Sequence, residues 1–224
     1  MKRLAFGAVM VLATSFVAQA ESASERLAAS AEVFQEVMDT PDKGIPQDLL
    51  SKAQCVVIIP GMKKGAFVVG GEYGRGFATC RRASGMGWGA SGAVRVEGGS
   101  FGLQLGGSST DVVMLVMNEN GMHKLLGDKF TLGADASVAA GPVGRTAAAD
   151  TDVKMTAEIL AWSRAKGLFA GISLSGATLR NDADTNAELY GHKIDNREVL
   201  GGTVEPPAAA QQLRSELDKY SMRK

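Results

Sequence analysis

The 224-residue sequence has little of several things: aromatic residues make up 6% of it, there are two histidines and two cysteines, and neither charge is in excess. The histidines, His123 and His192, lie far apart and lack zinc-type spacing with Cys55 or Cys80, so we predict no metal site. Basic and acidic residues number 24 each, which argues against a nucleic-acid-binding protein.

Sequence signatures of common enzymes are also missing. There is neither a G-x-S-x-G nucleophile turn nor a phosphate-binding G-x-x-x-x-G-K-[ST] loop. Residues Gly87–Gly92 match the dinucleotide pattern G-x-G-x-x-G, but a glycine-rich hairpin pattern follows them, whereas that motif must open a helix. Asp182, Asp184 and Asn186 have the spacing of EF-hand ligands, but the loop's glycine and final glutamate are replaced, so we expect a helix cap. We predict no catalytic residues and no cofactor; an enzyme that uses an unrecognised pair of acids stays an alternative.

Only one long apolar run is present, and it lies at the N-terminus. Leu4 to Val17 is apolar, follows the basic start Met1-Lys-Arg3 and precedes Ala18-Gln-Ala20, which is typical of a secretory signal peptide cleaved after Ala20. No other stretch reaches the roughly 20 apolar residues of a spanning helix. We therefore expect a periplasmic or secreted protein that can lie peripherally on an envelope membrane, without a cysteine at the cleavage site to carry a lipid.

The two cysteines would enter an oxidising compartment after export, where a pair can form a disulfide. Cys55 and Cys80 each fall in a predicted strand, and neighbouring strands could bring them within bonding distance. A buried free cysteine is the alternative at each position. We predict the Cys55–Cys80 disulfide.

Glycine, by contrast, is abundant: 15 of the 28 glycines lie between Gly61 and Gly107, among strand-forming residues. Glycine within strands marks bulges, tight bends or the close approach of another backbone, so this segment indicates a strongly curved sheet. Predicted strands cover residues 54–59, 66–70, 76–81, 92–96, 101–105, 111–117, 131–139, 153–162 and 167–175, with turns at 61–64, 72–75, 97–100 and 163–166.

Helices are predicted mainly at the ends of the chain. The first begins at the capping-box pair Ser22 and Glu25 and stops before Pro41; a helical turn at 122–126, a short helix at 184–190 and a terminal helix with Leu213 and Leu217 follow. The expected fold class is α+β: a curved, Gly-rich antiparallel sheet forming a barrel-like or sandwich body, with peripheral N- and C-terminal helices. We expect a signal peptide at 1–20, one domain at 21–200, and a linker with a C-terminal helix at 201–224.

Several phrases of the sequence resemble the SYLF domain family, in family order over roughly residues 27 to 192. They are Lys63-Lys-Gly-Ala-Phe67, Gly70-Gly-Glu-Tyr-Gly-Arg-Gly76, Gly102-Leu-Gln-Leu-Gly-Gly107, Thr110-Asp-Val-Val-Met-Leu115, Ala139-Ala-Gly-Pro-Val-Gly-Arg145 and Ala165-Lys-Gly-Leu-Phe-Ala-Gly-Ile-Ser-Leu174. The resemblance implies a non-enzymatic module that binds membrane lipid. Eukaryotic members are associated with phosphoinositides and actin, and bacterial members are exported proteins of poorly defined role.

A basic segment is the candidate binding site. Residues 61–96 contain six basic residues and one acid, in a mature chain with 22 basic and 24 acidic residues. Basic side chains that converge on one face attract an anionic surface, although basic residues on strands also serve as an ordinary solvated edge. Tyr73 is a second aromatic expected at the surface. The predicted lipid-binding residues are Lys63, Lys64, Arg75, Arg81, Arg82 and Arg95, with Trp88 as an interfacial aromatic.

The first predicted helix does not share this basic character. Its polar face carries Glu25, Glu32, Glu36 and Asp39, whereas a helix that lies on anionic lipid needs Lys and Arg there. We expect peripheral binding to anionic membrane lipid through the sheet. The alternative is a structural or interaction module that recruits another envelope protein. Actin is predicted to be an unlikely partner for an exported protein.

Overall fold

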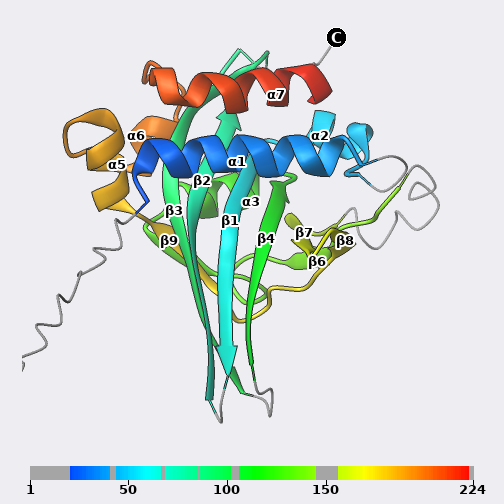
Figure 1. Ribbon diagram of the computed structural model, residues 1–224. Coiled ribbons are helices and arrows are strands. Elements are labelled where there is room, and N and C mark those ends of the chain that lie inside the picture. The colour runs from blue at the N-terminus through cyan, green and yellow to red at the C-terminus, as the bar shows by residue number, and fades with distance from the viewer. Residues whose placement is uncertain are drawn as a thin grey trace, which may run out of the picture.

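The structure, a computed structural model, describes residues 21–40, 44–66, 69–84, 86–101, 106–144 and 156–221. These residues form a strongly curled sheet with the strand order β5-β9-β3-β2-β1-β4-β7-β6, to which β8 adds by pairing with β7 (Figure 1). The strands are β1 (Cys55–Ala66), β2 (Val69–Arg81), β3 (Trp88–Phe101), β4 (Gly106–Val116), β5 (Lys129–Thr131), β6 (Val138–Ala140), β7 (Ile159–Ala165), β8 (Leu168–Gly171) and β9 (Thr178–Asn181). All pairs are antiparallel except β6 with β7. The predicted α+β class with a curved antiparallel sheet is confirmed.

Two helices lie side by side across one face of the sheet, which we call the outer face (Figure 1). They are α1 (Ala23–Met38) and α7 (Gln211–Ser221), preceded by a 3-10 turn at Ala208–Ala210. The remaining helices are α2 (Gln47–Lys52), α3 (Glu119–Leu125), α5 (Ala183–Tyr190) and α6 (Asn196–Leu200).

Strand alternation divides the buried side chains between two cores, because successive residues of a strand point to opposite faces. Ile58 and Phe77 pack on the outer face against α1, α2 and α7, whereas Val57 and Val94 belong to the core on the other side, which we call the inner face. Since both faces of the central strands are buried, the run Cys55–Ile59 is apolar at every position.

The N-terminal helix forms as predicted. The hydroxyl of Ser22 accepts a hydrogen bond from the Glu25 amide while the Glu25 carboxylate accepts from the Ser22 amide, which completes the capping box. Leu27 and Phe34 are fully buried beneath the helix. The terminal helix is also confirmed, with Leu213 and Leu217 buried against the same core.

The strands of the glycine-rich segment are longer than predicted, because a bulge replaces an expected turn. Between Ile58 and Lys63, β1 contains one residue more than β2 opposite it, and Gly61 adopts a φ of +56° while its amide donates to the carboxylate of Asp111 at 2.9 Å. The predicted turns at 61–64, 72–75 and 97–100 are therefore wrong; each lies inside a continuous strand.

Other boundaries differ where local pattern was a weak guide. The predicted strand at 131–139 is two short strands, β5 and β6, and the one at 167–175 ends at Gly171. The sequence pattern did not predict β9, α2 or α6. The signal peptide at 1–20 and parts of the predicted strands at 66–70, 101–105 and 153–162 lie outside the described residues.

Four strands continue beyond the body of the protein, away from α1 and α7 (Figure 1). We call this extension the stalk; its described residues are 62–66, 69–73, 97–101 and 106–110. The strand β9 pairs with β3 only as far as Glu97, and β7 pairs with β4 only as far as Asp111. In the stalk, β3 and β4 are therefore edge strands of a four-stranded sheet.

Candidate basic surface

Four basic residues lie opposite one another on adjacent strands: Arg75 of β2, Arg95 of β3, Arg180 of β9 and Lys129 of β5. Residues directly opposite in antiparallel pairs point to the same face of a sheet. Val94, Val96 and Leu179, their neighbours in sequence, belong to the inner core, so the four side chains point to the outer face. We call them the basic row.

Two carboxylates, Glu97 and Asp182, partly neutralise this row. Glu97 forms an ion pair with Arg95, its oxygen 2.9 Å from Nε, and accepts a hydrogen bond from Arg180 Nη1 at 3.1 Å; the side chains of both arginines are about one-third exposed. Lys129 is exposed and forms no ion pair with any residue that the structure describes. Because four basic residues face two carboxylates, the row retains an excess of positive charge. Like charges opposite one another destabilise a sheet, so this excess does not serve the fold.

Arg75 is held differently from the other three. Its guanidinium donates to both oxygens of Asp182, at 2.6 and 3.0 Å, and to the hydroxyl of Thr185 at 2.7 Å. Burial acts to raise the pKa of Asp182, but the hydrogen bonds from Arg75 and Thr185 outweigh it and hold the pKa below its usual value. The hydrogen bond to Asp182 in turn raises the pKa of Arg75. This pair ties the sheet to α5.

Helices α5 and α6 complete that tie at the edge of β3, above the end of β9. Asp182 caps α5, as the sequence predicts, and the side-chain oxygen of Asn186 accepts from the Ala93 amide at 2.7 Å. The amide group of Asn196 donates to the Ala93 carbonyl at 2.8 Å. Buried asparagines thus satisfy the backbone groups of β3 where no strand covers its edge.

Lys63 and Lys64, which were predicted to act together, point to opposite faces of the stalk. Lys63 points to the outer face, where it is exposed and its Nζ donates to the Ser109 hydroxyl at 2.9 Å. Lys64 points to the inner face and pairs with Glu72 at 3.0 Å. Consecutive strand residues cannot share a face, so the structure does not bring these two cations together.

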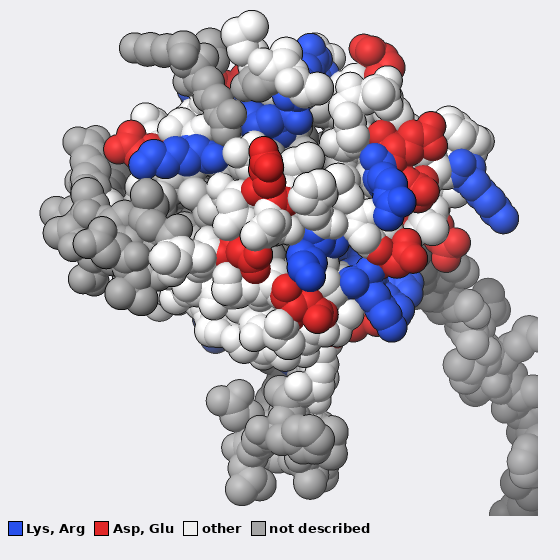
Figure 2. Space-filling view, turned by 180° about the vertical axis from the view of Figure 1, so that it is seen from behind, with Lys and Arg blue, Asp and Glu red and all other residues white. Residues whose placement is uncertain are grey.

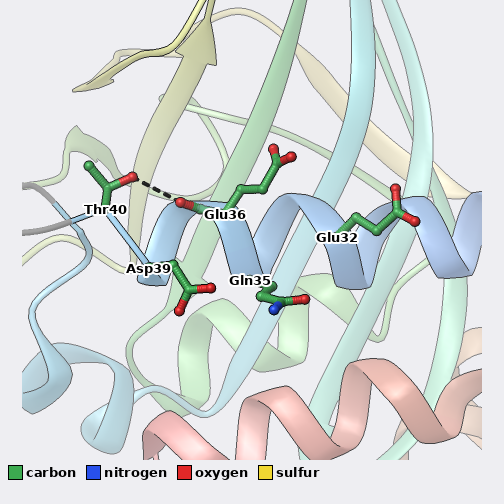
Figure 3. A pocket seen from close by; sticks show the side chains of 5 residues that line it. All are labelled: Glu32, Gln35, Glu36, Asp39 and Thr40. Atoms are coloured by element: carbon green, nitrogen blue, oxygen red, sulfur yellow. Dashed lines mark hydrogen bonds between the residues drawn. The ribbon is translucent and has the colours of Figure 1, made fainter.

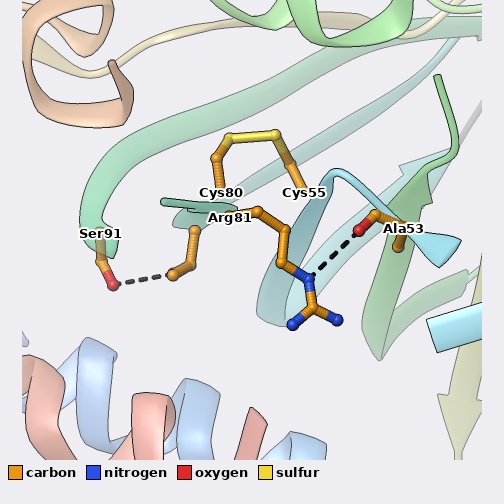
Figure 4. Close-up of a disulfide and its surroundings, with 6 residues drawn as sticks. Ala53, Cys55, Cys80, Arg81 and Ser91 are labelled. Atoms are coloured by element: carbon orange, nitrogen blue, oxygen red, sulfur yellow. Dashed lines mark hydrogen bonds between the residues drawn. A yellow bond between two sulfur atoms is a disulfide. The ribbon is translucent and has the colours of Figure 1, made fainter. Parts of the chain in front are cut away.

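Two other predicted contact residues are buried. Trp88 has 0% exposure, so its expected place at the surface is wrong; its indole nitrogen donates to the Ser221 hydroxyl at 2.9 Å. Arg81 is 7% exposed, and its guanidinium lies 4.0 Å from the Trp88 ring while it donates to backbone carbonyls of Leu50 and Ser221. These contacts join β2 to α2 and α7, and Figure 4 shows the further hydrogen bond to Ala53. Both residues are structural.

The predicted disulfide is present beside Arg81 (Figure 4). Cys55 and Cys80 lie opposite each other on β1 and β2, with an S–S distance of 2.06 Å, and both are buried in the inner core.

The structure therefore gathers only part of the predicted set. Arg75 and Arg95 meet Arg180 and Lys129, which sequence analysis missed because β9 was not predicted. Arg82 is exposed at the other end of β2, where its Nε donates to the carbonyl of Trp88. Of the predicted aromatics, Tyr73 is at the surface, with 46% exposure. In Figure 2 the basic side chains on the rear of the molecule lie beside acidic ones rather than forming a uniform patch.

A shallow hollow of about 520 Å³ lies on the exposed face of α1 (Figure 3). Its lining is acidic, and Figure 3 shows Glu32, Glu36 and Asp39 along the helix with the Thr40 hydroxyl donating to the Glu36 carbonyl. Arg164 of β7 forms ion pairs with both Glu36 and Asp111, which fixes this face relative to the sheet.

Among the described residues, no group of three or more potential metal ligands occurs. None of the helices that the structure describes is long and apolar enough to cross a membrane.

Comparison with known proteins matches residues 97–220 to the family described as "Ysc84: Las17-binding protein actin regulator". The chain belongs to this family. A relative named SH3 domain-containing YSC84-like protein 1 from Xenopus laevis is 33% identical over 183 residues, covering 81% of this chain and 54% of the relative. The human protein of the same name is 31% identical over 182 residues, with 81% and 53% covered. LAS seventeen-binding protein 3 of Saccharomyces cerevisiae is 33% identical over 175 residues, with 77% and 38% covered. The SYLF resemblance is confirmed.

The chain spans about half the length of the first of these relatives. The family description and the yeast relative's name concern binding to a protein and regulation of actin, and name no catalysis. The expectation that actin is an unlikely partner is therefore wrong as a statement about this family. The inference failed because it rested on the expected export of the chain rather than on its residues.

Proposed function

We propose that this protein is a non-enzymatic binding domain, exported to the bacterial envelope, that attaches peripherally to anionic lipid through the basic row on the outer face of its sheet. The observation that carries this proposal is the alignment of Arg95, Arg180 and Lys129 on adjacent strands with a single carboxylate, Glu97, among them. Guanidinium groups present paired donors that match phosphate oxygens, and each basic residue near an anionic membrane contributes about 1 kcal/mol.

The placement of the row supports the same function. Its side chains are partly exposed on the outer face, beside the exposed Lys63 and Tyr73 of the stalk. A tyrosine with an apolar ring and a polar hydroxyl suits the boundary between water and lipid. Arg75 is left out of the proposed contact, because Asp182 and Thr185 already occupy its guanidinium.

The test is co-sedimentation with vesicles of phosphatidylcholine alone and with phosphatidylglycerol added, at low and high salt. A variant with Arg95→Gln, Arg180→Gln and Lys129→Gln should lose up to about two orders of magnitude in affinity at low salt, since three contributions of about 1 kcal/mol are removed. Wild-type binding should weaken as salt rises.

A matched control removes the same charge elsewhere. Lys124→Gln, Lys193→Gln and Arg197→Gln change three exposed residues outside the row. This control should bind almost as wild type does. Equal losses in both triple variants would mean that net charge alone matters, and indifference of the wild type to phosphatidylglycerol and salt would remove the proposal.

Protein binding is a second candidate function, favoured by the family description as Las17-binding and actin-regulating. It can coexist with lipid binding, because the acidic face of α1 and the basic row are separate surfaces. Co-sedimentation with filamentous actin in the absence of vesicles tests it. Binding that persists in the basic-row variant would assign the two activities to different surfaces.

A further inference from the structure

Two arginines converge on one backbone carbonyl at the end of β2 opposite the stalk. Nε of Arg82, which directly follows β2, and Nε of Arg214, on α7, both donate to the carbonyl of Trp88, at 3.2 and 3.1 Å. The amide of Arg82 also donates to the carbonyl of Gly87 at 3.2 Å, which holds the two ends of the β2–β3 connection together. The shared carbonyl places the two guanidinium groups side by side.

This pair of cations has no counter-ion among the residues that the structure describes. Both Nε atoms lie within 3.2 Å of one oxygen, so they are no more than about 6 Å apart, a separation at which like charges repel. Neither arginine forms an ion pair with a carboxylate in this part of the chain, and each donates to it only through Nε. The Nη groups of both are therefore left to donate to solvent or to a ligand.

One carboxylate, that of Asp218 on α7, lies nearby without pairing with either arginine. A Cβ atom on Gly87 would lie 3.7 Å from its Oδ1, which places Asp218 beside the same connection. That oxygen is buried and has no hydrogen-bond donor among the described residues. Glu216 is turned to Lys219 instead. With Asp218 counted, the site carries one net positive charge, which matches a carboxylate better than a phosphate group with its nearly two negative charges.

An exposed methionine adjoins the two arginines. Met86 is 68% exposed, and only Gly87, with a φ of +70°, separates it from Trp88. Methionine adapts its shape to different apolar surfaces and is common where proteins bind varied partners. Guanidinium groups recognise carboxylates through paired hydrogen bonds. An apolar side chain beside two free guanidinium groups therefore fits a polypeptide that presents a carboxylate next to an apolar residue.

This site is separate from the basic row. Arg82 lies seven residues beyond Arg75. At about 3.3 Å per strand residue this is a distance of about 23 Å, which exceeds two Debye lengths at physiological ionic strength. Lipid that neutralises the basic row therefore leaves the charge of Arg82 and Arg214 uncompensated.

We propose that Arg82, Arg214 and Met86 bind an acidic segment of a partner protein, with a carboxylate between the two guanidinium groups and an apolar side chain against Met86. This inference goes beyond attachment to lipid, and it gives the second candidate function, protein binding, a surface and a partner chemistry. It also gives Arg82, which was predicted to contact lipid, a different ligand.

The experiment titrates the protein with a designed peptide in which glutamate alternates with leucine, and with a counterpart in which glutamine replaces each glutamate. NMR follows the Nε–H signals of the two arginines and the methyl signal of Met86, assigned with Arg82→Gln, Arg214→Gln and Met86→Leu. The glutamate peptide should shift all three signals, and the glutamine peptide should shift none. Equal shifts with both peptides, or none with either, would overturn the proposal.

Variants test the same site through affinity. Arg82→Gln with Arg214→Gln should weaken binding of the glutamate peptide by about tenfold or more, because hydrogen bonds to a charged group are lost. The matched control Lys124→Gln with Lys166→Gln removes two exposed charges on α3 and on the β7–β8 turn, and it should bind as wild type does. Asp218→Asn should strengthen binding by up to about fivefold, since it removes a negative charge beside the site. Near-UV circular dichroism verifies the folding of each variant.

Other ligands are outcomes of the same titration. If inorganic phosphate, or vesicles of phosphatidylcholine with phosphatidylglycerol, shift the three signals and the glutamate peptide does not, the proposal is wrong. Binding of the peptide by the arginine variant as tightly as by wild type would also refute it. If the protein binds anionic vesicles but not the peptide, only this inference fails, whereas binding of the peptide without binding of vesicles removes only the lipid proposal.

Discussion

Removal of the Cys55–Cys80 disulfide should lower the stability of the protein substantially without changing its fold. The bond joins residues separated by 25 positions and lies in the inner core, with both cysteines almost inaccessible to solvent. In the chain-entropy description, closing a loop of that length restricts the unfolded chain by about 3.5 kcal/mol at 25 °C. For a domain of this size, a loss of that magnitude corresponds to about 7–14 °C in Tm.

The assay compares wild type, wild type with reductant and the variant Cys55→Ala with Cys80→Ala, each by thermal and urea unfolding. Alanine keeps the positions apolar, so the buried sites acquire no unsatisfied polar group. Reductant should move wild type towards the variant and should leave the variant itself unchanged. Far-UV circular dichroism of all three samples should agree below the transition, because strand register is set by the packing of both sheet faces.

Two results would refute this reasoning. A loss of less than about 1 kcal/mol on removing the bond would mean that the unfolded chain already holds β1 and β2 together. Two titratable thiols in unreduced, denatured wild type would mean that the bond does not form at all.

Three further predictions concern the residues that join the sheet to its surroundings. Gly76→Ala should destabilise by about 3 kcal/mol or more, since its Cβ would lie 1.9 Å from a backbone carbonyl oxygen, whereas Gly65→Ala should be neutral or stabilise by up to about 1 kcal/mol; urea unfolding compares the two. Arg81→Met should cost about 2–4 kcal/mol in the same assay, because carbonyls of α2 and α7 lose their buried donor. Because the pKa of Asp182 lies below its usual value despite burial, owing chiefly to Arg75, ionised Asp182 stabilises the fold at neutral pH. That contribution is lost as pH falls below about 4, so Asp182→Asn should be less stable than wild type at pH 7 and closer to it at pH 3; a constant difference would contradict the assignment.

Short-range patterns were sufficient for α1 and α5, which begin with a cap, but not for α6, although Asp195 caps it. Ser22 and Glu25 satisfy each other's backbone amides, and Asp182 caps α5 with no contribution from distant residues except the arginine that pairs with it. Where a boundary depended on pairing with a distant strand, local pattern misled. Gly61 and Gly74 indicated turns, yet each lies inside a strand that its neighbours hold in register.

The candidate site shows the same division. Lys63, Arg75 and Arg95 could be named from a locally basic segment, but Arg180 and Lys129 come from strands far along the chain and reach the row only through β9 and β5. Trp88 and Arg81 had the composition of a membrane contact and are instead buried under α7. Residue type indicated an interaction with charge or lipid, while burial determined which side chains are free to make it.

The sequence by itself determined the fold class, the curved glycine-rich sheet and the capped helices α1 and α5, because those depend on local conformational preference and on a period-two pattern of apolar residues. It predicted the disulfide, but the register of β1 and β2 is what places Cys55 opposite Cys80. Tertiary structure alone decided which basic residues share a face and which glycines are forced by packing. Those properties follow from strand register and from the one-residue bulge at Gly61, and a shift of one residue in a strand moves each side chain to the opposite face.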